Sequence, residues 1–267
     1  MNFTDKVFIV TGAGSGIGKA LVVALLKRGA KVGAVDLKDD GLKDIITLTG
    51  TEASRSVSKA CDISDKTAVE NLVETFSSAF GQVDGIINCA GIIQPFVRVN
   101  DLSYEAIERV MKVNFYGTLY LVKSFLPMLL SRPEASIVTV SSMGGFLPVP
   151  GQSVYGASKA AVKLFTEGLF AELMETNVHV SVVFPGATKT NITENSHVIT
   201  PNVQQNDAKK IPMLTAEAVA EKIIRGMEKK KLYIYTGKDS NFMNRMYRLA
   251  PLFSVKMITR KMKGLLG

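Results

Sequence analysis

A tyrosine and a lysine four residues apart, Tyr155 and Lys159, are the side chains in this sequence best suited to acid–base chemistry. In a helix, that spacing puts the phenol and the ammonium on one face, one turn apart. A phenol becomes a base at neutral pH only where its surroundings favour phenolate by roughly 4 kcal/mol, part of which a nearby cation can supply. Because such a pair more often lies on a solvated helix face, the rest of the sequence has to decide its role.

A second reactive group precedes this pair. Residues 137–142, IVTVSS, are apolar and β-branched and end in two hydroxyls, which predicts a buried strand with Ser142 at its carboxyl end. We therefore expect Ser142 and Tyr155 to meet over one cleft.

A glycine-rich turn near the amino terminus predicts a phosphate site. Residues 6–11 form an apolar strand pattern that runs into GAGSGIG and then into a helical pattern. Small residues let backbone amides approach a pyrophosphate, and a helix N-terminus favours its charge. Gly12, Gly16 and Gly18 depart from the usual G-x-G-x-x-G spacing, and a turn that only packs helix on sheet is the alternative.

Asp36 indicates which dinucleotide would bind. It ends the predicted strand 31–36, where a carboxylate can accept hydrogen bonds from the ribose 2′-hydroxyl of NAD and repel the 2′-phosphate of NADP. Lys38, two positions further on, weakens this argument, and an aspartate that merely begins a turn is the plainer interpretation. The sequence favours NAD.

The elements that position these groups alternate between strands and helices. This alternation predicts an α/β fold: a single-domain, Rossmann-like, doubly wound parallel sheet of about seven strands, with helices on both faces and ligands at the carboxyl ends of the strands. The predicted strands are 6–11, 31–36, 56–62, 83–88, 137–142, 178–184 and 232–235, and the predicted helices include 65–80, one or two within 103–131, the Tyr155 helix to about 175, and 215–230.

Further motifs follow in the order of the chain. Together with those above, they are TGAGSGIG, Asp62, NCAG, Asn114, Ser142, Tyr155-GAS-Lys159 and PGATKT. Over roughly residues 5–235, this set resembles the short-chain dehydrogenase/reductase family. The resemblance implies an oxidoreductase that transfers hydride between NAD(H) and a secondary alcohol or ketone. A catalytically silent dinucleotide sensor or membrane-associated scaffold with the same fold is the alternative.

The resemblance also implies catalytic roles. Tyr155 would exchange the proton of the substrate oxygen, and Ser142 would hold that oxygen. Lys159 would lower the pKa of Tyr155 and bind the nicotinamide ribose, and Asn114 would hold a water on a proton path. Ser142 is preferred to Ser141 because its 13-residue separation from Tyr155 matches the family, so Ser141 is expected to pack behind the strand.

The family pattern further implies the cofactor contacts. Asp62 would lie at the adenine, Asn88 and Gly91 beside the adenine ribose, and residues 185–190 at the nicotinamide carboxamide. Cys89 departs from the family form NNAG and removes one polar contact. The expected NAD-binding residues are Gly12, Ser15, Gly16, Ile17, Gly18, Asp36, Asp62, Ile63, Asn88, Ala90, Gly91, Tyr155, Lys159, Pro185, Gly186, Thr188 and Thr190.

Two segments expected beside the reactive carbon, 92–96 and 144–151, are apolar and contain proline. They favour a bulky apolar alcohol or ketone, such as a steroid-like, lipid or long-chain carbonyl compound. The polar stretch 188–212 is expected to be a mobile lid. Its histidine, His197, has no partnered cysteine or acidic cluster, and His179 precedes an apolar strand, so we expect no metal site.

Charge separates the end of the chain from the rest. Of the net charge of +8, residues 240–267 contribute +6 without one acid, so we expect a catalytic domain over 1–239 and a basic amphipathic helical extension over 240–267. No nucleic-acid-binding signature accompanies the cations. The extension could lie on an anionic membrane, cover the substrate cleft or pack against another subunit. We expect a cytoplasmic homodimer or homotetramer with free thiols at Cys61 and Cys89.

Overall fold

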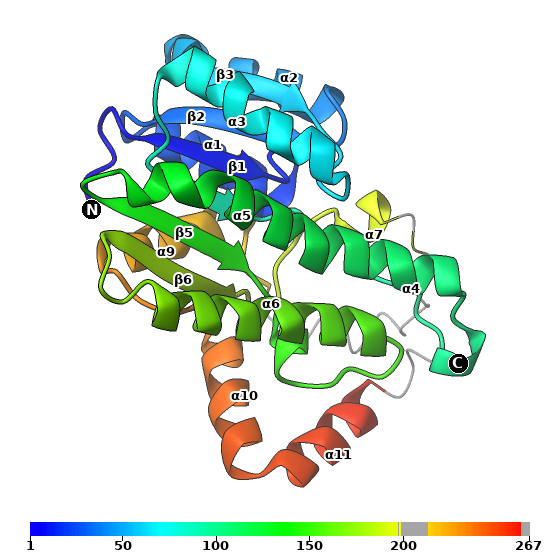
Figure 1. Cartoon of the computed structure of the whole chain (residues 1–267). Coiled ribbons are helices and arrows are strands. Elements are labelled where there is room, and N and C mark those ends of the chain that lie inside the picture. Colours follow the sequence, from blue (N-terminus) through cyan, green and yellow to red (C-terminus); the bar gives the residue numbers. More distant parts are fainter. Residues whose placement is uncertain (197, 199–212, 263–267) are drawn as a thin grey trace.

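The apolar runs of the sequence pair as seven parallel strands in the order β3-β2-β1-β4-β5-β6-β7 (Figure 1). The computed structural model of the chain describes residues 1–196, 198 and 213–262. The strands are nearly continuous in apolar residues because parallel strands are covered on both faces. They are β1 (Val7–Thr11), β2 (Lys31–Asp36), β3 (Ser56–Ala60), β4 (Gly85–Asn88), β5 (Ala135–Val140), β6 (Val178–Phe184) and β7 (Tyr233–Tyr235).

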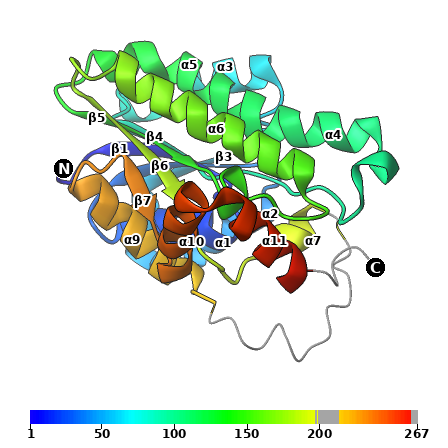
Figure 2. The ribbon, with the colours of Figure 1, turned by 90° about the horizontal axis from the view of Figure 1, so that it is seen from below.

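Helices cover both faces of the sheet (Figure 2). Helices α1, α2 and α9 pack on one face around Leu21 and Ile223, and α3, α5 and α6 pack on the other around Leu72 and Phe125. The α-helices are α1 (Gly16–Leu26), α2 (Asp40–Thr49), α3 (Lys66–Phe80), α4 (Tyr104–Met111), α5 (Gly117–Leu130), α6 (Ser153–Glu172), α7 (Ile192–Asn195), α9 (Ala216–Glu228), α10 (Lys238–Leu249) and α11 (Pro251–Lys261). Short helical turns are η1 (Gly50–Arg55), η2 (Val99–Asp101), the π-helical η3 (Lys112–Tyr116) and η4 (Met143–Gly145).

The predicted fold class is confirmed, and each predicted strand overlaps an observed one. Strand β5 ends at Val140, two residues earlier than predicted, so Ser142 lies in the loop that follows the strand. Because all the strands are parallel, the loops after their carboxyl ends gather at one edge of the sheet, where the site residues can meet.

The end of the chain forms two helices. Helix α10 ends at Leu249, and Pro251 begins α11, where proline is tolerated because the first helical turn needs no amide donor. The expected boundary between residues 239 and 240 falls inside the first turn of α10. No helix among the described residues combines the length and the apolar character needed to span a bilayer.

Candidate active site

A cavity of about 750 Å³ at the carboxyl edge of the sheet collects most of the predicted site. Its volume is typical of a small-molecule or cofactor site. Every predicted catalytic or cofactor-binding residue lines it, with two exceptions. Asn88 and Asn114 are buried, at 2% and 0% exposed, and do not line the cavity.

The glycine-rich turn leaves room for a phosphate group. Gly12 has a φ of +69°, which favours glycine, and a Cβ on Gly18 would overlap the Gly12 carbonyl oxygen. The N-cap residue of α1, Ser15, makes no side-chain bond to the helix backbone, so the first amides of α1 carry no side-chain cap. This cradle fits the pyrophosphate of a dinucleotide.

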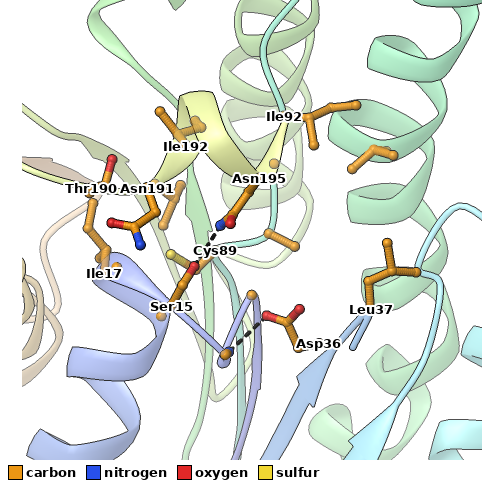
Figure 3. A pocket seen from close by; sticks show the side chains of 18 of the residues that line it. Ser15, Ile17, Asp36, Leu37, Cys89, Ile92, Thr190, Asn191, Ile192 and Asn195 are labelled. Carbon is orange, nitrogen blue, oxygen red and sulfur yellow. Dashed lines mark hydrogen bonds between the residues drawn. The ribbon is translucent and has the colours of Figure 1, made fainter. Parts of the chain in front are cut away.

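Asp36 is held at the end of β2 by the same turn (Figure 3). Its Oδ2 accepts a hydrogen bond from the Gly14 amide at 2.8 Å. No hydrogen bond to Oδ1 occurs among the described residues, so this oxygen can accept from a ligand. Lys38 and Asp40 also line the cavity, and the exposed Asp40 is ion-paired with Lys43 at 3.5 Å.

Ser142 and Tyr155 meet in the cavity, as expected. The hydroxyl of Ser142 accepts from the Gly144 amide at 3.0 Å. Burial raises the pKa of Tyr155, and the hydrogen bond from Ser142 lowers that pKa by a smaller amount. The phenol is therefore held protonated at neutral pH in this structure.

The ammonium of Lys159 is bonded to the end of β5. Its Nζ donates to the carbonyl oxygen of Val140 at 2.9 Å. Burial lowers the pKa of Lys159 to about 8. A Cβ at position 91 would lie 2.9 Å from this Nζ, so a larger residue there would displace the ammonium.

The two buried asparagines bond neighbouring segments of the chain to each other. Asn114 lies in the π-helical turn between α4 and α5; its Oδ1 accepts from the Ile92 amide, and its Nδ2 donates to the Ile92 carbonyl and to Ser158 Oγ, each at 2.9 Å. Asn88 Oδ1 accepts from Thr11 Oγ1 at 2.8 Å, while its Nδ2 is buried without a partner among the described residues. Asn88 therefore joins β4 to β1 and does not reach the cavity.

Ser141 is packed behind the strand, as the sequence predicts. It is buried, and its hydroxyl donates to the Lys159 carbonyl at 2.8 Å. This bond ties the end of β5 to α6 and leaves Ser142 as the serine whose hydroxyl reaches Tyr155.

Gln94 was expected only to border the substrate, yet it holds the helix that carries Tyr155. This fully buried side chain accepts from the amides of Val154 and Tyr155 at 2.8 and 3.0 Å through Oε1. Its Nε2 donates to the Gly151 carbonyl at 3.0 Å. No local signal reveals this role, because the partners lie 57 to 61 residues away.

The loop expected at the nicotinamide is held by the first turn of α10. Asp239 Oδ2 accepts from the Ala187 amide at 2.9 Å. A Cβ on Gly186 or Gly237 would overlap this carboxylate, so glycine is required on both sides of it. The position of residues 185–190 therefore depends on the first turn of α10 as well as on the sheet.

Helix α7 lies over the glycine-rich turn (Figure 3) and was not predicted. Asn195 Nδ2 donates to Ser15 Oγ at 2.8 Å, and the Ile93 amide donates to Ser196 Oγ at 3.0 Å. Both bonds belong to the start of the predicted lid. The rest of that lid, residues 197 and 199–212, with His197, lies outside the described residues.

The substrate wall differs from the expectation. Ile92 lines the cavity, but no residue of 144–151 does, because side chains such as Leu147, 3% exposed, are used in packing. The apolar lining comes instead from Val113, Met143 and Ile192. Among the residues that the structure describes, no three His, Cys, Asp or Glu side chains group as metal ligands would.

Comparisons with known proteins agree with this geometry. The sequence profile of the short chain dehydrogenase family matches residues 6–198. The Mycobacterium tuberculosis protein SadH is 32% identical over 254 residues, which cover 93% of this chain and 92% of SadH. An uncharacterized oxidoreductase of Staphylococcus aureus strain MRSA252 is 34% identical over 217 residues, 81% of this chain and 90% of that protein.

Two solved structures share the fold. A short-chain dehydrogenase/reductase from Burkholderia phymatum in complex with NAD superposes with a TM-score of 0.85 at 25% identity, covering 95% of this chain and 96% of its own. Levodione reductase superposes with a TM-score of 0.79 at 25% identity, covering 90% and 99%.

Proposed function

Because the chain belongs to the short-chain dehydrogenase/reductase family, we propose that it interconverts a bulky, apolar secondary alcohol and its ketone with NAD(H). One observation carries the proposal: Ser142, Tyr155 and Lys159 line the same cavity as the glycine-rich turn. A group that exchanges a proton, a donor for the substrate oxygen and a dinucleotide cradle therefore share one site.

Each residue has one task in the proposed reaction. Ser142 donates a hydrogen bond to the substrate oxygen. When a ketone is reduced, the phenol of Tyr155 gives its proton to that oxygen, and when an alcohol is oxidised, the phenolate takes the hydroxyl proton. The nicotinamide supplies or accepts the hydride at the carbon. Lys159 holds the nicotinamide ribose, and its charge favours the phenolate when its ammonium faces that side.

We propose NAD as the preferred dinucleotide. The free Oδ1 of Asp36 is available to the ribose hydroxyls. The Asp36 carboxylate would repel the 2′-phosphate of NADP. Asp40 adds little to this repulsion, because it is exposed and ion-paired with Lys43 at 3.5 Å, and the positive charge of Lys38 acts against it. The preference for NAD therefore rests on Asp36.

The substrate class follows from the cavity wall. Ile92, Val113, Met143 and Ile192 offer apolar surface, which favours an aliphatic or polycyclic ligand over a sugar. We also propose that the protein works as a homodimer or homotetramer, which light scattering would test.

Replacement of Tyr155 by Phe tests the reaction. Tyr155→Phe should bind NADH as the unsubstituted protein does and lose turnover, because only the hydroxyl group that exchanges the proton is removed. Tyr116→Phe is the matched control, since Tyr116 is 42% exposed and does not line the cavity. The measurements are NADH fluorescence titration and turnover on a panel of apolar alcohols and ketones.

Two results would contradict the proposal. Full turnover by Tyr155→Phe would show that another group exchanges the proton. Tight NADH binding by the unsubstituted protein without turnover of any alcohol or carbonyl compound would instead support the silent sensor or scaffold.

A further inference from the structure

The corner between α10 and α11 is an exposed apolar tip. Leu249, Leu252 and Phe253 are 87%, 75% and 62% exposed, and Phe242 lies on the same face of α10 as Leu249, seven residues earlier. The corner projects from the body of the molecule, on the side away from α3 and β3 (Figure 1). Large apolar side chains gathered at a protruding corner mark an interaction surface.

Both helices of the corner carry cations that have no acidic partner among the described residues. No residue from 240 to 262 is acidic, and no ion pair joins the cations of α10 or α11 to an acid in the described part of the chain. Some cations elsewhere in the chain are paired, as Lys19 is with Asp44 and Arg28 with Glu221, both at 2.8 Å. These cations are Arg245 and Arg248 on α10 and Lys256, Arg260 and Lys261 on α11, the last two in the final turn of that helix.

We infer that the α10–α11 corner docks on an anionic lipid bilayer. Leu249, Leu252 and Phe253 would enter the boundary between headgroups and acyl chains, and the flanking cations would bind lipid phosphates and carboxylates. A second copy of the chain fits this surface less well, because a symmetric interface would bring two sets of unpaired cations together.

The docking surface is connected to two segments beside the reactive side chains, η4 and the loop at residues 185–190. Helix α10 packs against η4, which follows Ser142, and its Asp239 holds the Ala187 amide. Docking would therefore bring the substrate end of the cavity to the bilayer, from which an apolar alcohol or ketone could enter. This last step rests on the proposed function, whereas the docking itself does not.

Vesicle co-sedimentation of the full chain, without cofactor or substrate, tests the docking. The unsubstituted protein should bind phosphatidylcholine vesicles that contain phosphatidylserine, and binding should weaken with salt and be absent from pure phosphatidylcholine. Leu252→Ser with Phe253→Ser should abolish sedimentation. Leu48→Ser is the matched control, because Leu48 is 55% exposed on α2, outside the tip. Each cation replaced by Gln should lower the partition coefficient about fivefold.

Three outcomes would overturn the inference: no binding to anionic vesicles at low salt, equal binding by the tip variant, or a lower molar mass of the tip variant in light scattering. The last would show that the tip joins copies of the chain. Point variants are preferable to removal of residues 240–267, because that truncation cuts α10, which anchors the loop at residues 185–190. Since no cofactor is present, failure of docking and failure of the Tyr155 test are independent.

Discussion

Replacement of Gln94 by Leu should damage both the stability and the chemistry of this protein. The change keeps the approximate volume of the side chain but removes its three hydrogen bonds. The amides of Val154 and Tyr155 and the carbonyl of Gly151 then lose their partner. The amides suffer most, because the first amides of a helix have no partner within the helix.

The magnitude follows from these groups. A buried polar group left without a partner costs about 1–3 kcal/mol. The two amides are only partly buried, so water replaces part of each lost bond, and we expect the free energy of unfolding to fall by about 2–4 kcal/mol. At ~2–4 °C per kcal/mol for a chain of this size, the unfolding midpoint should fall by about 4–16 °C.

Activity should fall more than cofactor binding. Gln94 fixes the backbone of Tyr155 itself, and a displacement of the reacting group by about 1 Å can cost ~100-fold in rate. The glycine-rich turn is untouched, so NADH affinity should change little. Thermal unfolding, NADH fluorescence and kcat on one substrate measure the three effects separately.

Gln94→Glu is the informative control. A carboxylate still accepts from both amides and suits a helix N-terminus, whereas the bond to the Gly151 carbonyl is lost. This variant should therefore lie between the unsubstituted protein and Gln94→Leu. If Gln94→Leu unfolds at the unsubstituted midpoint and keeps its kcat, Gln94 does not position Tyr155 and our reasoning is wrong.

Three further predictions follow from the site. Asp36→Ala should weaken NAD binding by about 1–3 kcal/mol, because a charged hydrogen bond is lost, and should relieve the repulsion of NADP. Titration with both dinucleotides measures the two effects, and unchanged affinities would mean that Asp36 only shapes a turn. Gly18→Ala should abolish NADH binding or unfold the turn, because its Cβ would overlap the Gly12 carbonyl oxygen; normal NADH fluorescence enhancement with an unchanged unfolding midpoint would contradict this. Burial lowers the pKa of Lys159 from 10.5 to about 8, so between these pH values the unfolded chain binds more protons than the folded one. The free energy of unfolding of the unsubstituted protein should therefore increase with pH across this range, relative to that of Lys159→Met. Denaturation of the cofactor-free proteins across that window measures the difference, and parallel curves would refute it.

Much of the fold could be predicted because its signals are local. Apolar runs of five or six residues followed by turn residues indicate strands, and the glycine-rich turn follows the first of them directly. Helix α7 was not predicted, because four residues in a polar stretch are too few to show a helical period. The apolar segment 144–151 does not line the cavity, and composition alone does not say whether an apolar side chain faces a ligand or the core.

The sequence by itself determined that Tyr155 and Lys159 share a helix face and that Ser142 follows a buried strand, because these relations depend on spacing within one element. Only the tertiary structure decided which groups those side chains meet. Lys159 faces the Val140 carbonyl, Gln94 holds the amide of Tyr155, and Asp239 holds that of Ala187, across separations of 19, 61 and 52 residues. Such bonds form between elements that packing brings together. The orientation of the packed elements decides which donor meets which acceptor, and spacing along the sequence does not carry that information.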